Sequence, residues 1–170
     1  MEKKNNIYLI GFMGAGKTTI GKFLSQKLNY NFVDLDLHIE KEQGISISEM
    51  FEKHGEKYFR DAETESLRKF SEKSNQIIST GGGIVIKDEN WQIMRNRGVS
   101  VYLKSSIKTL FNRVKHKSTR PLLNVENPFE KAKELFSSRE SLYEKSDIII
   151  DREGLEPGDV ADAIVRELDI

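Results

Sequence analysis

The chain alternates short apolar runs with longer stretches in which apolar residues recur every three or four positions. Short runs of this kind are typical of buried strands, and the longer stretches are typical of helices with one buried face. Because strands separated by helices form βαβ units, the order predicts an α/β fold of three layers, with a parallel sheet between two sets of helices. The five expected strands are 7–10, 32–33, 77–80, 99–103 and 147–151.

Helical spacing predicts several of the elements between and after these strands. A single apolar stripe indicates a helix over 17–28, and the segment 45–71 is expected to be mainly helical with a break at Gly55. A further helix follows Leu103 as far as Val114. The last helix is expected over 157–168, since proline suits a first helical turn. Ligands of such folds bind beyond the carboxyl ends of the strands.

Composition narrows the class of protein and of partner. A chain of 170 residues is long enough for one domain with a single core, expected to span 1–170. The 27 Lys and Arg residues equal the 27 Asp and Glu residues, so no overall field attracts nucleic acid or an anionic membrane. There is no cysteine, and no apolar run approaches the length of a signal or membrane segment. We therefore expect a cytoplasmic protein without nucleic-acid or membrane partners.

The segment Gly-Phe-Met-Gly-Ala-Gly-Lys-Thr at 11–18 matches the phosphate-loop pattern at every fixed position. Glycine allows backbone N–H groups to converge on a polyphosphate, the lysine supplies a cation, and the threonine hydroxyl suits Mg²⁺. The alternative is a simple glycine turn, but the pattern lies between a strand and a helix, as nucleotide binding requires. The residues expected to bind a nucleoside triphosphate here are Gly14, Ala15, Gly16, Lys17, Thr18 and Thr19.

Two carboxylates, Asp34 and Asp36, follow the second expected strand. Asp34 is a candidate for holding Mg²⁺ together with Thr18, and Asp36 is a candidate for orienting or deprotonating a substrate hydroxyl. The alternative is that Asp36 only caps the helix that follows. Whether Asp36 is a true base or an orienting group stays open.

Arginines and glycines give weaker signals. Taken singly, Arg60 and Arg139 are weak signals, because a lone arginine on a helix is more often a solvated ion-pair partner than a site residue. The three glycines at 81–83 after a strand indicate either a tight turn or close contact of backbone N–H groups with a ligand. Arg120 lies in a polar excursion at about 115–126 that is expected to be a mobile lid carrying a catalytic cation, although a solvated loop arginine is the alternative.

Together these residues resemble the shikimate kinase family, and the resemblance runs from about Ile7 to Val165. Seven motifs occur in the family's order. They are Gly-Phe-Met-Gly-Ala-Gly-Lys-Thr at 11–18, Phe-Val-Asp-Leu-Asp at 32–36, Ile-Ser-Ile-Ser-Glu-Met-Phe at 45–51, Gly-Glu-x-x-Phe-Arg at 55–60, Ser-Thr-Gly-Gly-Gly at 79–83, Arg-Pro-Leu-Leu at 120–123 and Arg-x-x-x-Tyr at 139–143.

The resemblance implies a phosphate-loop NTPase fold like that of nucleoside monophosphate kinases. It implies transfer of the γ-phosphoryl group of ATP to the 3-hydroxyl of shikimate, a step of aromatic amino acid (chorismate) biosynthesis. Mg²⁺ is the implied cofactor, and a monomer is expected. The implied catalytic residues are Lys17, Asp36 and Arg120, and Mg²⁺ would be held by Thr18 and Asp34. Shikimate would be bound by Asp36, Arg60, Gly81, Gly82, Gly83 and Arg139. Asp36 and Arg60 belong to an implied shikimate-binding segment at about 34–62.

The adenine side matches the family less closely. Arg113 is similar to the family's adenine-stacking arginine, and Pro157 is expected on the other face of the base, with Arg120 also binding nucleotide. The loop 151–156 departs from the family's pattern, so Arg152 is only a candidate nucleotide contact. The rival interpretations are a kinase acting on gluconate or a nucleotide, and a nucleotide-gated regulatory module without turnover.

Overall fold

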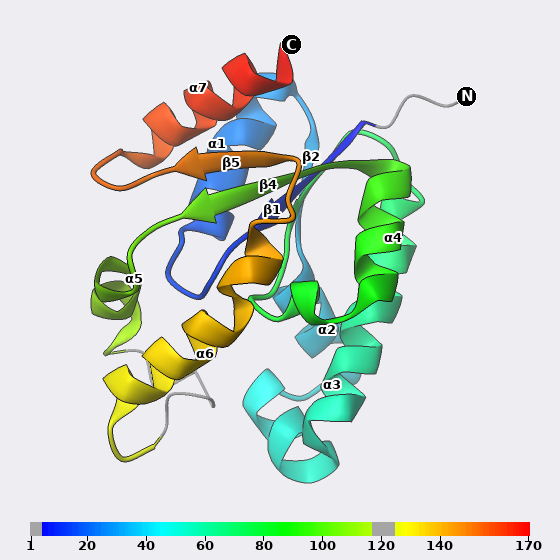
Figure 1. The fold of residues 1–170 in the computed structure, drawn as a ribbon. Helices are drawn as coiled ribbons and strands as arrows, with labels where there is room; N and C mark the ends of the chain where they lie inside the picture. Colours follow the sequence, from blue (N-terminus) through cyan, green and yellow to red (C-terminus); the bar gives the residue numbers. More distant parts are fainter. Residues whose placement is uncertain (1–4, 117–124) are drawn as a thin grey trace.

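The computed structural model describes residues 5–116 and 125–170, and these form one parallel five-stranded sheet with helices on both faces (Figure 1). The sheet order is β2-β3-β1-β4-β5. All four strand pairings are parallel. The strands are β1 (Asn6–Ile10), β2 (Asn31–Asp34), β3 (Gln76–Ser79), β4 (Gly98–Lys104) and β5 (Ile148–Asp151). The predicted α/β class and all five strands are confirmed, with ends shifted by at most one residue.

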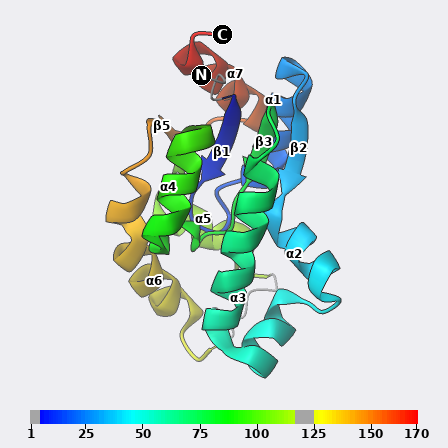
Figure 2. The same cartoon turned by 90° about the vertical axis from the view of Figure 1, so that its right-hand side faces the viewer.

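The helices complete the three layers. Helices α1 and α7 contact each other on one side of the sheet, while α3 and α4 contact each other on the other side (Figures 1 and 2). The predicted helices over 17–28 and 157–168 are confirmed at both ends. The helices are α1 (Lys17–Leu28), α2 (Leu35–Gln43), α3 (Ile47–Ser71), α4 (Asp88–Arg97), α5 (Ile107–Val114), α6 (Pro128–Tyr143) and α7 (Pro157–Leu168), with a short 3₁₀ turn, η1 (Ile84–Ile86).

The core is centred on β1, whose five residues are all buried. Parallel strands covered by helices on both faces read as continuous apolar runs, which is why the segment 7–10 shows no alternation. Burying a large apolar side chain contributes roughly 1.5–3 kcal/mol, so these residues fix the sheet. The phosphate-loop motif therefore begins at the end of a fully buried strand.

A second, smaller hydrophobic cluster joins α2 to α3. Its buried members are Ile39, Met50 and Phe59. Helix α3 is interrupted at Gly55, whose φ of 84° and ψ of 171° are not helical, as the sequence predicted. The rings of Phe51 and Phe59 pack 5.2 Å apart across this break. This cluster holds the part of α3 that carries Arg60.

Within residues 5–116 and 125–170, no helix has the length and apolar character needed to cross a membrane.

Candidate active site

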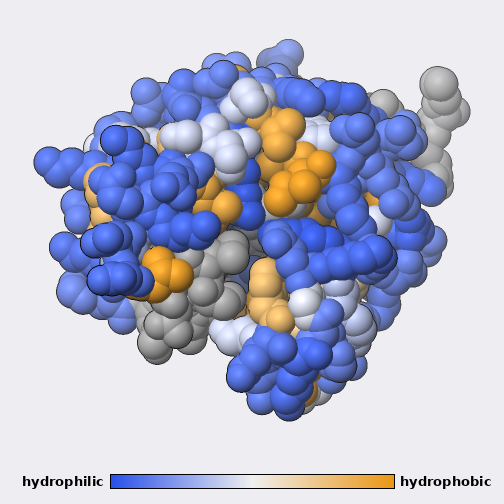
Figure 3. Space-filling model, turned by 60° about the horizontal axis from the view of Figure 1, so that its bottom comes forward, coloured by the Kyte–Doolittle hydropathy of each residue, from blue (hydrophilic) through white to orange (hydrophobic). Residues whose placement is uncertain are grey.

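A cavity of about 740 Å³ opens where β1, β2 and β3 end. Its size falls within the range of small-molecule sites. The surface on this side of the molecule is largely hydrophilic (Figure 3). The predicted site residues that line it are Gly14, Gly16, Lys17, Thr18, Thr19, Asp34, Asp36, Arg60, Gly81, Gly82, Gly83, Arg113 and Arg139. Segments far apart in the chain thus meet in one place. Ala15 and Pro157 are not among the lining residues, and Arg120 lies outside the described residues.

The phosphate loop connects β1 to α1 and has the backbone that its glycines allow. Gly14 and Gly16 have φ values of 83° and 88°, in the left-handed region that favours glycine. Gly16 is the N-cap of α1, so this helix begins at the cavity. The N–H groups in the first turn of a helix are not used by hydrogen bonds within that helix. The Lys17 Nζ atom donates to the carbonyl oxygens of Gly11, at 2.5 Å, and Phe12, at 3.1 Å.

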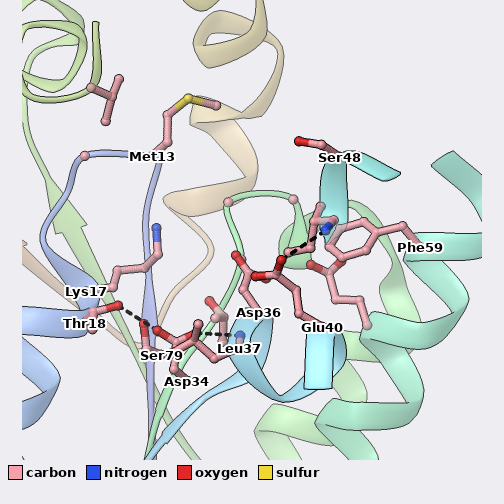
Figure 4. A pocket seen from close by; sticks show the side chains of 18 of the residues that line it. Met13, Lys17, Thr18, Asp34, Asp36, Leu37, Glu40, Ser48, Phe59 and Ser79 are labelled. Atoms are coloured by element: carbon pink, nitrogen blue, oxygen red, sulfur yellow. Dashed lines mark hydrogen bonds between the residues drawn. The ribbon is translucent and has the colours of Figure 1, made fainter. Parts of the chain in front are cut away.

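Thr18 and Asp34 lie side by side at the floor of the cavity. The Thr18 hydroxyl donates to Asp34 Oδ2 over 2.9 Å, and Asp34 Oδ1 accepts the Leu37 N–H at 3.2 Å (Figure 4). Asp34 is therefore the N-cap of α2. The alternative that Asp36 caps this helix is wrong, because Asp36 lies inside the first turn and its side chain lines the cavity.

Asp36 lies near Glu63, an acidic residue that was not among the candidate site residues predicted from the sequence. A Cβ atom added to Gly81 would lie 3.0 Å from Asp36 Oδ1 and 2.7 Å from Glu63 Oε2, so both carboxyl groups adjoin the same glycine. Glu63 is fully buried on α3. In Figure 4, Asp36 lies between Lys17 on one side and Phe59 on the other.

Burial raises the pKa of Glu63 to about 7. The attraction of the Arg60 guanidinium lowers this pKa, the nearby Asp36 carboxylate raises it, and Arg139 lowers it slightly. Near neutral pH Glu63 is thus divided between its charged and neutral forms. Glu63 is thus a second acidic group in this part of the cavity, beside Asp36.

Both predicted shikimate-binding arginines are buried and line the cavity. Arg60 Nη1 donates to Glu63 Oε1 at 3.0 Å, and its Nη2 donates to Glu56 Oε1 at 3.3 Å. Arg139 extends from α6 toward the glycine turn, where Tyr143 also donates its hydroxyl to the Gly82 carbonyl at 2.6 Å. The interpretation of either arginine as a solvated surface residue is wrong.

The three glycines form a turn and also adjoin the arginines. The Ile84 N–H donates to the Gly81 carbonyl at 3.1 Å, which closes a turn between β3 and η1. A Cβ atom on Gly83 would overlap the Arg60 guanidinium. The tight-turn interpretation is therefore confirmed, and the turn leaves the space that the Arg60 guanidinium occupies. The contact of its backbone N–H groups with a ligand stays a prediction.

Gly83→Ala is expected to weaken shikimate binding by about tenfold, because the new methyl group displaces the Arg60 guanidinium from its place beside Glu63 and so disturbs a charge-assisted contact. Isothermal titration with shikimate measures this. The matched control is Gly158→Ala, where an added Cβ meets no atom within contact distance. Equal shikimate affinity in Gly83→Ala and wild type would show that Arg60 does not need this space.

Arg113 and Pro157 are the two residues predicted to lie on the faces of the adenine. Arg113 on α5 is exposed, lines the cavity and donates through Nη1 to the Gly14 carbonyl at 2.9 Å. Pro157 occupies the first turn of α7, as expected from proline's fixed φ. The two residues thus stand on different elements, with Pro157 outside the cavity lining.

Comparison with known proteins matches this geometry to a family. The profile described as shikimate kinase covers residues 13–169. A shikimate kinase of Thermodesulfovibrio yellowstonii is 50% identical over 162 residues, covering 95% of this chain and 94% of the relative. The chain belongs to the shikimate kinase family. It is an ATP-dependent kinase by that membership.

Solved structures agree with the family assignment. A shikimate kinase from Acinetobacter baumannii in complex with shikimate has a TM-score of 0.94 and 36% identity, and the match covers 98% of this chain and 94% of that one. A deoxyadenosine kinase from M. mycoides, with a TM-score of 0.61 and 20% identity over 97% of this chain and 100% of its own, shares the fold. The predicted nucleoside-monophosphate-kinase-like architecture is therefore confirmed.

Glu63 gives this family member an expected pH signature. Its folded-state pKa, about 7, lies above its unfolded value, so the folded state binds the extra proton and is most stable below the unfolded pKa. This contribution is lost as pH rises from about 4.5 to above 7. As pH rises over that interval, the free energy of unfolding of wild type should therefore fall relative to that of Glu63→Gln. Urea titrations at several pH values would measure this difference. A constant difference would contradict the assigned pKa.

Proposed function

We propose that this chain is a shikimate kinase that transfers the γ-phosphoryl group of ATP to the 3-hydroxyl of shikimate, giving shikimate 3-phosphate and ADP. The observation that carries this proposal is the single cavity that joins a phosphate loop to two buried arginines and a carboxylate. The relative solved with shikimate supports the same acceptor here. The step belongs to aromatic amino acid (chorismate) biosynthesis.

The nucleotide occupies the phosphate-loop end of the cavity in this proposal. Backbone N–H groups at Gly14, Ala15 and Gly16 and the start of α1 bind the phosphates, because positive-φ glycines and a helix N-terminus converge on anions. Lys17 leaves the Gly11 and Phe12 carbonyls to bind the β and γ oxygens. The remaining proposed nucleotide contacts are Thr18, Thr19, Arg113 and Pro157, with Arg120 outside the described residues.

Thr18 and Asp34 are proposed to hold Mg²⁺. Their oxygens lie 2.9 Å apart, and a hydroxyl and a carboxylate are the hard donors that this ion prefers. Among residues 5–116 and 125–170 no group of three or more His, Cys, Asp or Glu side chains forms a metal cluster, so two protein donors beside ATP phosphates suit Mg²⁺ better than a resident transition metal. When bound, the ion supplies charge neutralisation at the β and γ oxygens.

Shikimate is proposed to occupy the other end of the cavity. Arg60 and Arg139 bind its carboxylate, since guanidinium groups pair with carboxylates through two parallel hydrogen bonds. The glycine turn at Gly81, Gly82 and Gly83 completes the pocket with backbone groups. Glu63 keeps Arg60 in place and offsets one of the two positive charges.

Asp36 faces the reacting hydroxyl in this arrangement. The 3-oxygen forms a bond to the γ-phosphorus as the bond from that phosphorus to the β–γ bridging oxygen breaks, and the electron pair of the broken bond stays on ADP. The hydroxyl proton passes to Asp36 or is held by it until the new bond has formed. Lys17 lies across the cavity from Asp36 and stabilises charge on the transferred group (Figure 4).

An acceptor screen tests the proposal against its rivals. ADP release is followed with shikimate, gluconate and nucleoside monophosphates, each against the ATPase background. Stimulation by shikimate alone is expected. Stimulation by another acceptor would identify a different kinase, and shikimate binding without ADP release would identify a regulatory module.

We also propose a monomer of one domain, residues 1–170, acting in the cytoplasm. One chain supplies both ends of the cavity, and the segment 34–62 contributes Asp34, Asp36 and Arg60 to it. The proposed lid at 115–126 lies mostly outside the described residues. In this proposal its closure excludes water that would otherwise consume ATP.

A further inference from the structure

Arg152 is a buried cation that no part of the proposed reaction uses. It follows β5 in the loop that departs from the family's pattern, and its backbone N–H donates to the Lys104 carbonyl at 3.0 Å. Only 5% of the residue is exposed, and it is not among the residues lining the cavity. A direct contact with the nucleotide, which the sequence left open, therefore does not fit its position.

The guanidinium instead lies against the back of the phosphate loop. Its Nη1 atom donates to the Ala15 carbonyl at 2.6 Å, and its Nη2 atom donates to the Leu155 carbonyl at 3.2 Å. A Cβ atom on Gly16 would overlap Nη1, so the arginine reaches this place only because residue 16 is glycine. Sequence reasoning assigned that glycine to the phosphate alone, whereas Arg152 occupies its other side.

The bond to Ala15 fixes the orientation of one peptide group of the loop. In a trans peptide the C=O and the following N–H point in opposite directions. Holding the Ala15 carbonyl against Arg152 therefore turns the Gly16 N–H away from Arg152, toward the opposite side of the loop. Lys17 and Thr18, which follow this peptide, line the cavity on that side.

Arg152 also adds positive charge to the loop. Both of its side-chain hydrogen bonds go to carbonyl oxygens, so neither bond pairs the guanidinium with a carboxylate. Burial and then the nearby charge of Arg113 lower the pKa of Arg152, whereas the charges of Glu153 and Glu156 raise it by less. Arg113 donates to Gly14 as Arg152 donates to Ala15, so two guanidinium groups hold consecutive carbonyls of the loop. A bound polyphosphate relieves the repulsion between two such cations.

We propose that Arg152 is a positioning residue for nucleotide binding, which orients the Gly16 N–H toward the phosphates and raises the positive potential of the loop from behind. The inference rests on the proposed binding of ATP at the phosphate loop. It assigns Arg152 to polyphosphate affinity and to neither adenine nor shikimate recognition.

The test compares ligands that contain different parts of the two substrates. Arg152→Met removes the charge and both hydrogen bonds, while Arg152→Lys keeps the charge but does not bond two carbonyls in the same fork geometry. Arg166→Met, at an exposed position on α7, is the matched control. Dissociation constants are measured for ADP, inorganic tripolyphosphate, adenosine and shikimate, by calorimetry and, for weak ligands, by NMR.

Arg152→Met should weaken the binding of ADP and tripolyphosphate by about tenfold, as expected for loss of a charged hydrogen bond near a bound anion. Arg152→Lys should weaken the binding of both by less. The affinities for adenosine and shikimate should stay at the wild-type values in both variants. The control should match wild type for all four ligands. Should Arg152→Met not fold, the same comparison of ADP with adenosine in Arg152→Lys decides.

Three results would overturn the inference: unchanged ADP and tripolyphosphate affinities, equal losses for adenosine and ADP, or an equal loss for shikimate. The second would place Arg152 at the adenine, and the third would give it a general structural role. Wild-type protein that binds neither ADP nor tripolyphosphate would instead contradict the proposed function, so the two failures are distinguishable.

Discussion

Asp36→Asn should lower kcat by roughly 10²–10⁴-fold while shikimate affinity changes little, because the amide keeps the size and part of the hydrogen bonding but does not take the hydroxyl proton. The carboxyl group lines the cavity opposite the phosphate loop and adjoins Gly81. It is therefore placed to act on the acceptor hydroxyl and not on the carboxylate, which the arginines bind. Stopped-flow or coupled ADP-release kinetics give kcat, and calorimetry gives the shikimate dissociation constant.

Asp61→Asn on α3 is the control for Asp36→Asn. Asp61 is exposed and pairs with Lys57 at 2.8 Å on the outer surface, so its loss should leave kcat near the wild-type value. A small loss of kcat in Asp36→Asn with a large loss of shikimate affinity would reverse the assigned role. In that case Asp36 would bind the substrate without taking part in its activation.

Arg139→Ala should weaken shikimate binding by about 100-fold or more, since it removes a buried guanidinium from a site for a carboxylate. Arg139 is buried on α6, and its guanidinium lies near Gly82 at the acceptor end of the cavity. ADP affinity should be unchanged, because Arg139 is assigned to the carboxylate of shikimate and not to the phosphates of the nucleotide. Calorimetric titration with each ligand separates the two effects.

Arg97→Ala, at an exposed position that ends α4, is the control for Arg139→Ala and should bind both ligands as wild type does. Equal weakening of ADP and shikimate by Arg139→Ala, with the fold intact, would contradict a division of the cavity into two ends. Retained shikimate affinity would show that Arg60 alone binds the carboxylate.

The phosphate loop and the sheet could be predicted because both depend on local sequence. A buried strand, a fixed glycine pattern and a helix stripe occur together within residues 7–28, and each feature constrains the others. The carboxyl ends of parallel strands meet at one edge, so Asp34 and the glycines at 81–83 were expected there. Their common cavity follows from topology.

Glu63 could not be recognised in the same way, because an acidic residue on a charged helix normally indicates a solvated face. A signal was nonetheless present: Glu63 lies four residues after Phe59 and four before Leu67, on the stripe of α3 that is buried. A carboxylate on an apolar stripe indicates a buried, paired acid. Arg60, three residues earlier, is the partner.

The position of Arg152 depends on long-range contacts that no local pattern encodes. Arg152 turns inward to Ala15, far away in the chain, and only the folded arrangement of β5 beside β4 brings the two together. Sequence spacing does not indicate on which side of a loop a side chain packs. The place of Pro157 in the first turn of α7 was predicted correctly, whereas its contact with the adenine depends on long-range packing and stays a prediction.

The central claim is that one cavity brings the γ-phosphoryl group of ATP to the 3-hydroxyl of shikimate. The most direct measurement is NMR of the reaction mixture, with phosphorus–carbon coupling used to locate the new phosphate ester. We predict one ester, coupled to carbon 3 and its neighbours, formed in equal amount to ADP. Release of inorganic phosphate without an ester, or an ester at another hydroxyl, would contradict the claim.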